Sequence, residues 1–300
     1  MESGFLQRMR TAARSALAGI CRGPVAGAAL ARFRRPERRE ESASVHMLVS
    51  SRTWHAGLLA AASFEFFTGR RWPLFIHEDG TVGVDARAEI GRVLPGVTFV
   101  PRAEADARAA EAFAGCPLSL AHRAKYNLFL KFADTLAYAD RERFIVLDSD
   151  VLFFREPSEI LAWADSGSRE CLYNEDTREK FCIPRGEVAA RAGAELLPRF
   201  NSGLVLMQKA AMRTGRTEEF FAQIGDAAHA PQFFEQTLYA LMASENPGGG
   251  CALPRTYSIS WGLWREKGCI SRHYVGDFKH DLLYIEGAPI LLSAFRSRRS

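Results

Sequence analysis

The sequence predicts an α/β protein in which a mixed, mostly parallel, Rossmann-like sheet is flanked by helices. Residues 144–147 are wholly apolar without alternation, which is typical of a strand buried on both faces. Buried-strand and helical patterns alternate from residue 45 onward. The 300 residues, 47% of them hydrophobic, are enough to bury one large core. We therefore expect one α/β domain at residues 45–300, preceded by a basic N-terminal helical arm at residues 1–44.

The predicted elements of this domain follow one another as strand and helix. Gly, Pro and Asp-rich turns separate them. The first turn between strand and helix holds no G-x-G-x-x-G, so the dinucleotide-binding fingerprint is absent. We expect strands at 45–49, 73–77, 97–100, 144–147 and 204–207, helices at 54–67, 86–93, 120–138, 158–163 and 232–243, and an irregular segment at 166–198 with a helical patch at 187–197.

Composition indicates a cytoplasmic protein. No apolar run approaches the ~20 residues that span a bilayer, and the N-terminus lacks the apolar block of a signal peptide. The six cysteines form no C-x-x-C pair, which predicts reduced thiols and neither disulfides nor zinc. Arginine greatly outnumbers lysine, and alanine is abundant. We associate this composition with bacterial genomes rich in G and C.

The N-terminal arm carries most of the basic charge. Residues 1–44 hold nine Arg against four Glu. On a helical wheel one face is apolar, with Arg8, Arg10 and Arg14 outside it. A peripheral position on an anionic inner-membrane surface and a helix packed on the domain, followed by a solvated linker, both fit this pattern. No aromatic interleaving favours nucleic acid. The apolar face comprises Phe5, Leu6, Met9, Ala13, Leu17 and Ile20, and a second basic cluster comprises Arg32, Arg34, Arg35, Arg38 and Arg39.

Two carboxylates stand at the end of the apolar central strand, in the D-x-D motif Asp148-Ser149-Asp150. Parallel sheets bind ligands at the carboxyl ends of their strands. In extended chain, residues two apart point to the same side, so both carboxylates could face one divalent cation that bridges a nucleotide diphosphate. An Asx turn that merely closes the strand is the alternative interpretation.

Three further motifs follow in a fixed order: F-N-S-G at 200–203, E-Q at 235–236 and H-Y-V-G-D-F-K at 273–279. With the acidic triplet they resemble nucleotide-sugar glycosyltransferases of the GT-A fold. The chain is most similar to glycosyltransferase family 8, the retaining group that includes glycogenin and bacterial lipopolysaccharide galactosyl- and glucosyltransferases. The resemblance spans about residues 45–290 and rests most firmly on the terminal motif.

The resemblance implies that Asp148, Asp150 and His273 coordinate a divalent metal. Two carboxylates and one imidazole suit Mn²⁺ well and Mg²⁺ tolerably. Gly276 would let the backbone approach a phosphate closely. Lys279 would neutralise charge on the departing diphosphate, and so contribute to catalysis.

The resemblance also assigns residues to the donor sugar. Asn201 matches an asparagine that holds the sugar or shapes its pocket, and Gly203 leaves room beside it. Glu235 and Gln236 occupy the place of the family's usual Asp-Gln. We expect Gln236 to face the positive charge that develops at the anomeric carbon. Glu235 would contact sugar hydroxyls or acceptor, and is the motif residue able to serve as a nucleophile.

Other donor contacts are expected from position in the fold alone. Lys125, with Arg123 as a rival, lies on the helix before the acidic strand, where family members place a basic residue that touches the donor. Ser51 and Arg52 follow the first strand and would neighbour the nucleotide base and ribose. His280 stands where the family often has Pro-Trp, which would alter how the C-terminal loop closes.

The expected activity is metal-dependent transfer of a hexose from a UDP-sugar to a hydroxyl of a glycan or glycolipid, with retention of configuration. A non-catalytic sugar-nucleotide-binding module remains an alternative. A sugar-phosphate nucleotidyltransferase would need a glycine-rich and basic phosphate loop, which residues 50–52 do not offer. A glycoside hydrolase could use paired carboxylates but would leave the motif at 273–279 without a purpose.

Overall fold

The computed structural model describes residues 2–260, 262–276 and 278–297, with the backbone alone for residues 2–10. Its larger sheet has the strand order β3-β2-β1-β4-β7-β6-β8. β1 runs parallel to β2 and β4, whereas β7 lies antiparallel between β4 and β6. The predicted mixed, mostly parallel α/β sheet is confirmed. Its strands are β1 (Ser44–Val49), β2 (Leu74–Glu78), β3 (Thr98–Val100), β4 (Arg143–Leu147), β6 (Cys171–Glu175), β7 (Phe200–Gln208) and β8 (Gly250–Ala252).

The central strand β4 explains why its sequence shows no polar alternation. Successive side chains of a strand point to opposite faces of the sheet. Ile145 and Leu147 belong to the core on one face, while Phe144 and Val146 belong to the core on the other. Both faces of β4 are therefore buried, as the apolar run predicts.

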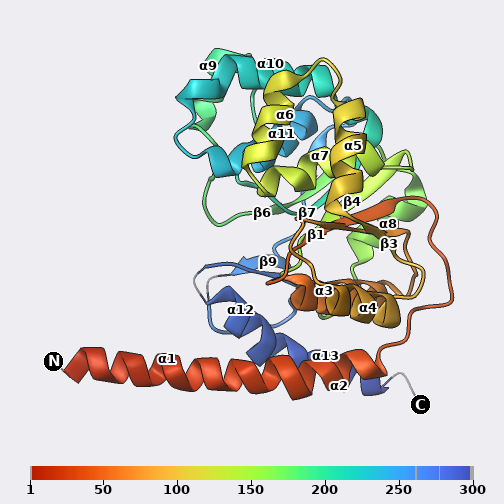
Figure 1. Ribbon diagram of the computed structural model, residues 1–300, viewed down its shortest axis with the longest axis vertical. Coiled ribbons are helices and arrows are strands. Elements are labelled where there is room, and N and C mark those ends of the chain that lie inside the picture. Colours follow the sequence, from red (N-terminus) through yellow and green to blue (C-terminus); the bar gives the residue numbers. More distant parts are fainter. Residues whose placement is uncertain (1, 261, 277, 298–300) are drawn as a thin grey trace.

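Helices cover both faces of the sheet (Figure 1). α3 and α4 lie on one side, and α5, α6, α7 and α11 lie on the other. The helices between the first strand and the C-terminal segment are α3 (Trp54–Thr68), α4 (Val84–Val93), α5 (Arg102–Ala112), α6 (Pro117–Lys125), α7 (Leu128–Tyr138), α8 (Ser158–Ser166), α9 (Arg185–Ala192), α10 (Thr214–Ile224) and α11 (Phe234–Ser244), with short 3₁₀ turns η2 (Lys209–Ala211), η3 (Gly225–Ala227) and η4 (Pro231–Phe233).

A second, three-stranded sheet has the order β5-β10-β9. Its strands are β5 (Val151–Phe153), β9 (Tyr257–Ser260) and β10 (Ser271–Tyr274). β10 pairs antiparallel with β5, in a register that sets His273 opposite Val151. Because Val151 directly follows the acidic triplet, this pairing places His273, from the C-terminal part of the chain, beside the end of β4.

Two of the sequence predictions for this domain need correction, and two helices were missed. The expected helix at 120–138 is two helices, since Tyr126 has extended backbone between α6 and α7. The segment at 166–198, expected to be irregular, contains β6 as well as α9. β6 is stabilised by pairing with β7 and β8, partners that lie outside its own sequence window. The Ala-rich helix α5 and the helix α10 were not predicted.

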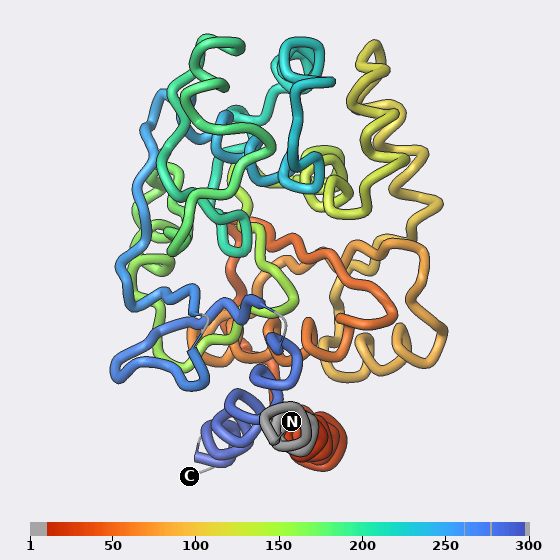
Figure 2. The backbone as a smooth tube through the Cα atoms, turned by 90° about the vertical axis from the view of Figure 1, so that its left-hand side faces the viewer, coloured from red at the N-terminus to blue at the C-terminus, as the bar shows by residue number. Residues whose placement is uncertain are grey.

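The N-terminal arm is a rod of helix that lies along the domain beside α13 (Ala288–Ser297) (Figures 1 and 2). It consists of α1 (Glu2–Ile20), a π-helical turn η1 (Cys21–Val25) and α2 (Ala26–Arg32). The chain's last segment reaches α13 through α12 (Lys279–Leu282) and the π-helical η5 (Leu283–Gly287). No described helix is both long enough and apolar enough to cross a bilayer.

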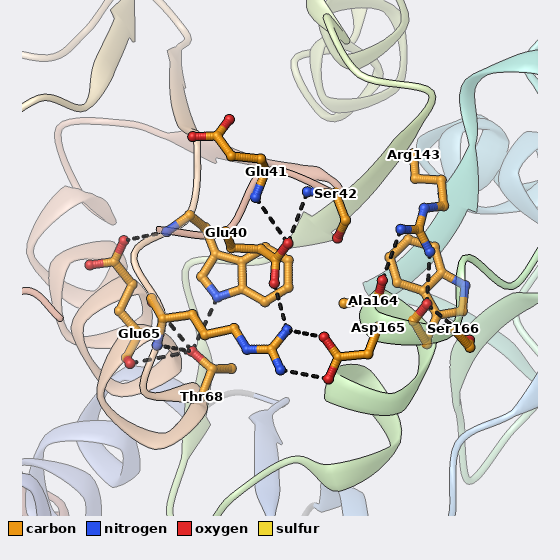
Figure 3. A network of polar contacts seen from close by, with 12 residues as sticks. Glu40, Glu41, Ser42, Glu65, Thr68, Arg143, Ala164, Asp165 and Ser166 are labelled. Atoms are coloured by element: carbon orange, nitrogen blue, oxygen red, sulfur yellow. Dashed lines mark hydrogen bonds and ion pairs between the residues drawn. The ribbon is translucent and has the colours of Figure 1, made fainter. Parts of the chain in front are cut away.

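The segment that joins the arm to β1 is not the solvated linker that one alternative assumed. Arg35 is almost fully buried and its Nε donates to Glu65 Oε2 at 2.7 Å. Arg70 bridges two carboxylates, Glu40 at 2.5 Å and Asp165 at 2.7 Å (Figure 3). The buried side chains of Arg35 and Glu40 thus anchor the segment on the domain, although residues 37–39 between them are exposed.

Candidate metal centre

Asp148, Asp150 and His273 converge at the carboxyl end of β4. Their ligand atoms all lie within 4.8 Å of one another, and among the described residues they form a group able to hold a metal ion. The two carboxylates meet through a tight turn, in which Val151 N–H donates to the carbonyl of Asp148 at 3.2 Å. The expectation of extended chain with alternating side chains is therefore wrong here, although both carboxylates still face one point.

The orientation of His273 suits a metal ligand. Its Nδ1 lies 3.0 Å from the side-chain oxygen of Asn201, which can only accept a hydrogen bond. Nδ1 therefore carries the hydrogen and Nε2 keeps the lone pair that binds metals. Nε2 lies 3.1 Å from Asp150 Oδ1 and 4.0 Å from Asp148 Oδ2. Neighbouring ligands of an octahedral cation with bonds of about 2.1 Å stand about 3 Å apart, so these residues fit such an ion.

Asn201 and Gly203 both lie against His273. Asn201 Nδ2 donates to Asp176 Oδ2 at 3.0 Å, and its oxygen also accepts the Gly203 N–H at 2.9 Å. A Cβ at Gly203 would lie 2.5 Å from ring atoms of His273. The F-N-S-G motif thus makes room for the imidazole and fixes its tautomer. The three side-chain hydrogen bonds of Asn201 are all made to groups of the protein itself.

Lys279 and Gly276 complete the C-terminal side of the centre. Lys279 Nζ lies 2.7 Å from Asp150 Oδ2. Burial by itself would raise the pKa of Asp150, but the positive charges of a protonated His273 and of Lys279 hold that pKa well below its usual range when no metal is bound. The negative charge of Asp150 likewise raises the pKa of Lys279. Gly276 has φ of +90°, a conformation that favours glycine.

A buried lysine that sequence analysis missed links the D-x-D motif to the E-Q motif. Lys131, from α7, lies 2.8 Å from Asp148 Oδ1 and 3.0 Å from Glu235 Oε1, and donates to Ser202 Oγ at 3.2 Å. Burial alone would lower the pKa of Lys131, but the two carboxylates raise it above its ordinary value. The sequence does contain a signal for it, because Lys131 is the single charge inside the apolar run of residues 128–133. A charge on a buried helix face requires a partner of opposite charge.

Glu235 and Gln236 lie behind this lysine on α11. Glu235 is 4% exposed, and desolvation raises its pKa to about 7 although Lys131 opposes the shift. Its Oε2 accepts the Ser202 hydroxyl at 3.0 Å. The Gln236 amide accepts the Ser202 N–H at 3.3 Å and donates to the Lys180 carbonyl at 2.6 Å. Both side chains are thus held inside the protein, next to the cluster.

A cavity extends from Asp148 and Asp150 across the carboxyl ends of β1 and β2. Asp150 and Lys279 stand at one end of it. Its wall combines aliphatic side chains with hydroxyl, amide and carboxylate groups, a mixture that can hold a polar ligand with an apolar face. The remaining lining residues are Leu48, Val49, Ser50, Thr53, Asp79, Asn127, Leu128, Lys131, Asp148 and Ser149.

Several expected donor contacts lie outside this cavity. Lys125 is exposed, with its ammonium 5.2 Å from the centre of the Tyr126 ring. Arg123 is buried in an ion pair with Asp134 at 2.7 Å. The cavity is lined by Ser50 and Thr53 instead of the exposed residues 51 and 52 that lie between them. The structure brings Lys131 to the cluster, one helix after the position predicted from the sequence.

No family model and no curated protein matches this sequence. Solved structures do share its fold. The galactosyltransferase LgtC, in complex with donor and acceptor sugar analogues, superposes with a TM-score of 0.52 at 18% identity, covering 85% of this chain and 95% of that one. Mouse xyloside xylosyltransferase 1 in its apo form gives 0.51 at 14% identity, covering 77% and 96%.

The bifunctional glycosyltransferase WbbM also matches, with a TM-score of 0.51 at 13% identity over 86% of this chain and 52% of that chain. At these identities the likeness shows the fold and not the reaction. The chain therefore has an α/β fold of the GT-A glycosyltransferase type, with a group of two aspartates and one histidine that is able to hold a metal.

Proposed function

We propose that this protein is a metal-dependent glycosyltransferase that moves a hexose from a UDP-sugar to a hydroxyl group of a glycan or glycolipid. The observation that carries the proposal is the meeting of Asp148, Asp150 and His273 with Lys279 beside one cavity, at the ligand-binding edge of the sheet. LgtC, which shares the fold, was solved with donor and acceptor sugar analogues.

The residues of the cluster divide the work of binding a nucleoside diphosphate. Mn²⁺ or Mg²⁺ held by Asp148, Asp150 and His273 would supply Lewis-acid stabilisation of the leaving diphosphate. Lys279 adds a positive charge to the same phosphate oxygens, and Gly276 permits close approach of the backbone. Lys131 holds Asp148 in place through its ion pair, while Asn201 keeps the lone pair of His273 Nε2 directed at the cluster.

The retaining outcome would follow from attack on the face from which the diphosphate leaves. The bond from the anomeric carbon to phosphate oxygen breaks, the bond to the acceptor oxygen forms, and a phosphate oxygen takes the acceptor's proton. A double displacement would require Glu235 as nucleophile. The burial of Glu235 and its ion pair with Lys131 argue for the same-face route.

A donor panel with Mn²⁺, read as release of free UDP in the presence of candidate acceptors, tests the proposal. We expect one UDP-hexose to be consumed, and Asp150→Ala to abolish its turnover. Asp140→Ala is the matched control, because Asp140 is a half-exposed aspartate whose ion pair with Arg141 is 3.8 Å long. Calorimetric donor binding without turnover across all acceptors would show a binding module instead, and full activity of Asp150→Ala would contradict the metal site.

A further inference from the structure

The N-terminal rod turns an apolar face away from the rest of the molecule. Leu17 is 46% exposed and Ile20 is 58% exposed, which is high for residues of this size. Small and apolar side chains surround them on the same side of the rod. We call this set the outward face, and it comprises the exposed residues Ala13, Ala16, Leu17, Ile20 and Pro24.

The opposite side of the rod is the side that packs on the domain. Ala18 and Cys21 are buried there. Arg14 donates to Asp281 Oδ2 at 2.9 Å, and its guanidinium lies 3.5 Å from the centre of the Phe278 ring. An amphipathic helix ordinarily turns its apolar stripe toward the core. Here the core contacts are made by the other side, so the described part of the stripe, Ala13, Leu17 and Ile20, is left for another partner.

The charge of the rod identifies the chemistry of that partner. The rod, residues 2–32, contains five arginines and one glutamate. Arg22 and Arg34 are exposed. A second copy of this rod would bring two strongly basic helices together, which Coulomb repulsion opposes. An anionic lipid surface satisfies both properties, because acyl chains accept the apolar side chains and head groups attract the arginines.

We propose that the outward face docks on an anionic lipid surface with the rod lying flat along it. The rod and α13 lie together at one border of the molecule (Figures 1 and 2). Leu17 and Ile20 enter the acyl boundary, and the net positive charge of the rod attracts the head groups. The proposal is independent of the sugar chemistry.

Co-sedimentation of the full chain with vesicles tests this directly. Vesicles of phosphatidylcholine with about 30% phosphatidylglycerol are compared with vesicles of phosphatidylcholine alone. We expect binding to the anionic vesicles, a fall in binding as salt is raised, and at least about a tenfold weaker partition for the double variant Leu17→Glu/Ile20→Glu.

The double variant Val84→Glu/Leu118→Glu is the matched control. Val84 and Leu118 are 77% and 45% exposed and lie on α4 and α6, which are not part of the rod. It adds the same charge, so its vesicle binding should stay within about twofold of the parent protein. Circular dichroism melts of both variants report folding.

Three outcomes would overturn the proposal. The first is unchanged vesicle binding by the Leu17→Glu/Ile20→Glu variant. The second is equal binding to neutral and anionic vesicles. The third is a dimer in sedimentation equilibrium that this variant converts to monomer while the parent protein ignores vesicles, which would make a second copy the occupant.

Discussion

The imidazole of His273 donates its Nδ1 hydrogen to the side-chain oxygen of Asn201 across 3.0 Å, although 72 residues separate the two in the chain. Asn201 is 6% exposed and its amide nitrogen is held in turn by Asp176. This chain of bonds fixes which imidazole nitrogen faces Asp148 and Asp150. Removing a group that orients a ligand in this way ordinarily weakens metal binding by 10- to 100-fold.

Replacing Asn201 with Ala should therefore weaken Mn²⁺ binding by about 10- to 100-fold, because His273 loses the acceptor that fixes its tautomer. Calorimetric titration of Mn²⁺ in the absence of donor measures this effect. Asn246→Ala is the control, since Asn246 is 8% exposed and its amide bonds backbone groups, the carbonyls of Arg169 and Gly249 and the N–H of Gly248. Equal affinity in Asn201→Ala and the parent protein would show that the hydrogen bond does not orient the ligand.

Replacing Gly203 with Ala should displace His273, because the new methyl group would lie 2.5 Å from two atoms of the ring. We expect loss of Mn²⁺ binding by more than about tenfold, with a smaller fall in thermal stability from overpacking. Gly215→Ala is the matched control, since a Cβ there meets nothing within 4 Å. If both variants bind Mn²⁺ like the parent protein, β7 does not set the position of the imidazole.

Replacing Lys131 with Met should destabilise the protein by about 3 kcal/mol, because it leaves Glu235 buried without its cation. The second change Glu235→Gln should restore much of that stability, since it removes the orphaned charge. Urea unfolding monitored by circular dichroism gives both values. Additive losses in the double variant would contradict a coupled pair.

Acid should weaken the fold through His46 and His77, which lie on β1 and β2 and share a hydrogen bond of 3.0 Å. Burial, helped by the positive charge of Arg123, lowers the pKa of His77 to about 3. Burial also lowers the pKa of His46 well below its ordinary value, and the neighbouring His77 adds to this shift. A histidine with a lowered folded pKa contributes full stability above its unfolded pKa of about 6.5, and that stability is lost as the pH falls.

Between about pH 6.5 and about pH 5 the loss from His77 alone should be about 2 kcal/mol. Urea unfolding across that range measures it. The variant His77→Leu should show a flatter pH dependence than the parent protein. A slope that is unchanged in His77→Leu would assign the acid sensitivity to other groups.

Local patterns in the sequence determined the fold class and the identity of the three candidate ligands. Strand and helix periods are properties of neighbouring residues, so the order of β1, α3, β2, α4 and β3 follows from them. Asp148, Asp150 and His273 were selected by residue type and motif, and the structure brings them within 4.8 Å. The strand β6 escaped prediction because its stability comes from pairing with β7 and β8.

Tertiary structure alone decided what the surrounding residues do. Lys131 reaches Asp148 through the packing of α7 on the sheet, and Lys279 reaches Asp150 from 129 residues away through the pairing of β10 with β5. The sequence also did not show which side of the N-terminal rod packs on the domain, because a helical wheel identifies an apolar face but not the face that the domain covers. Sequence periodicity reports which residues share a face, whereas only the assembled fold fixes what each face meets.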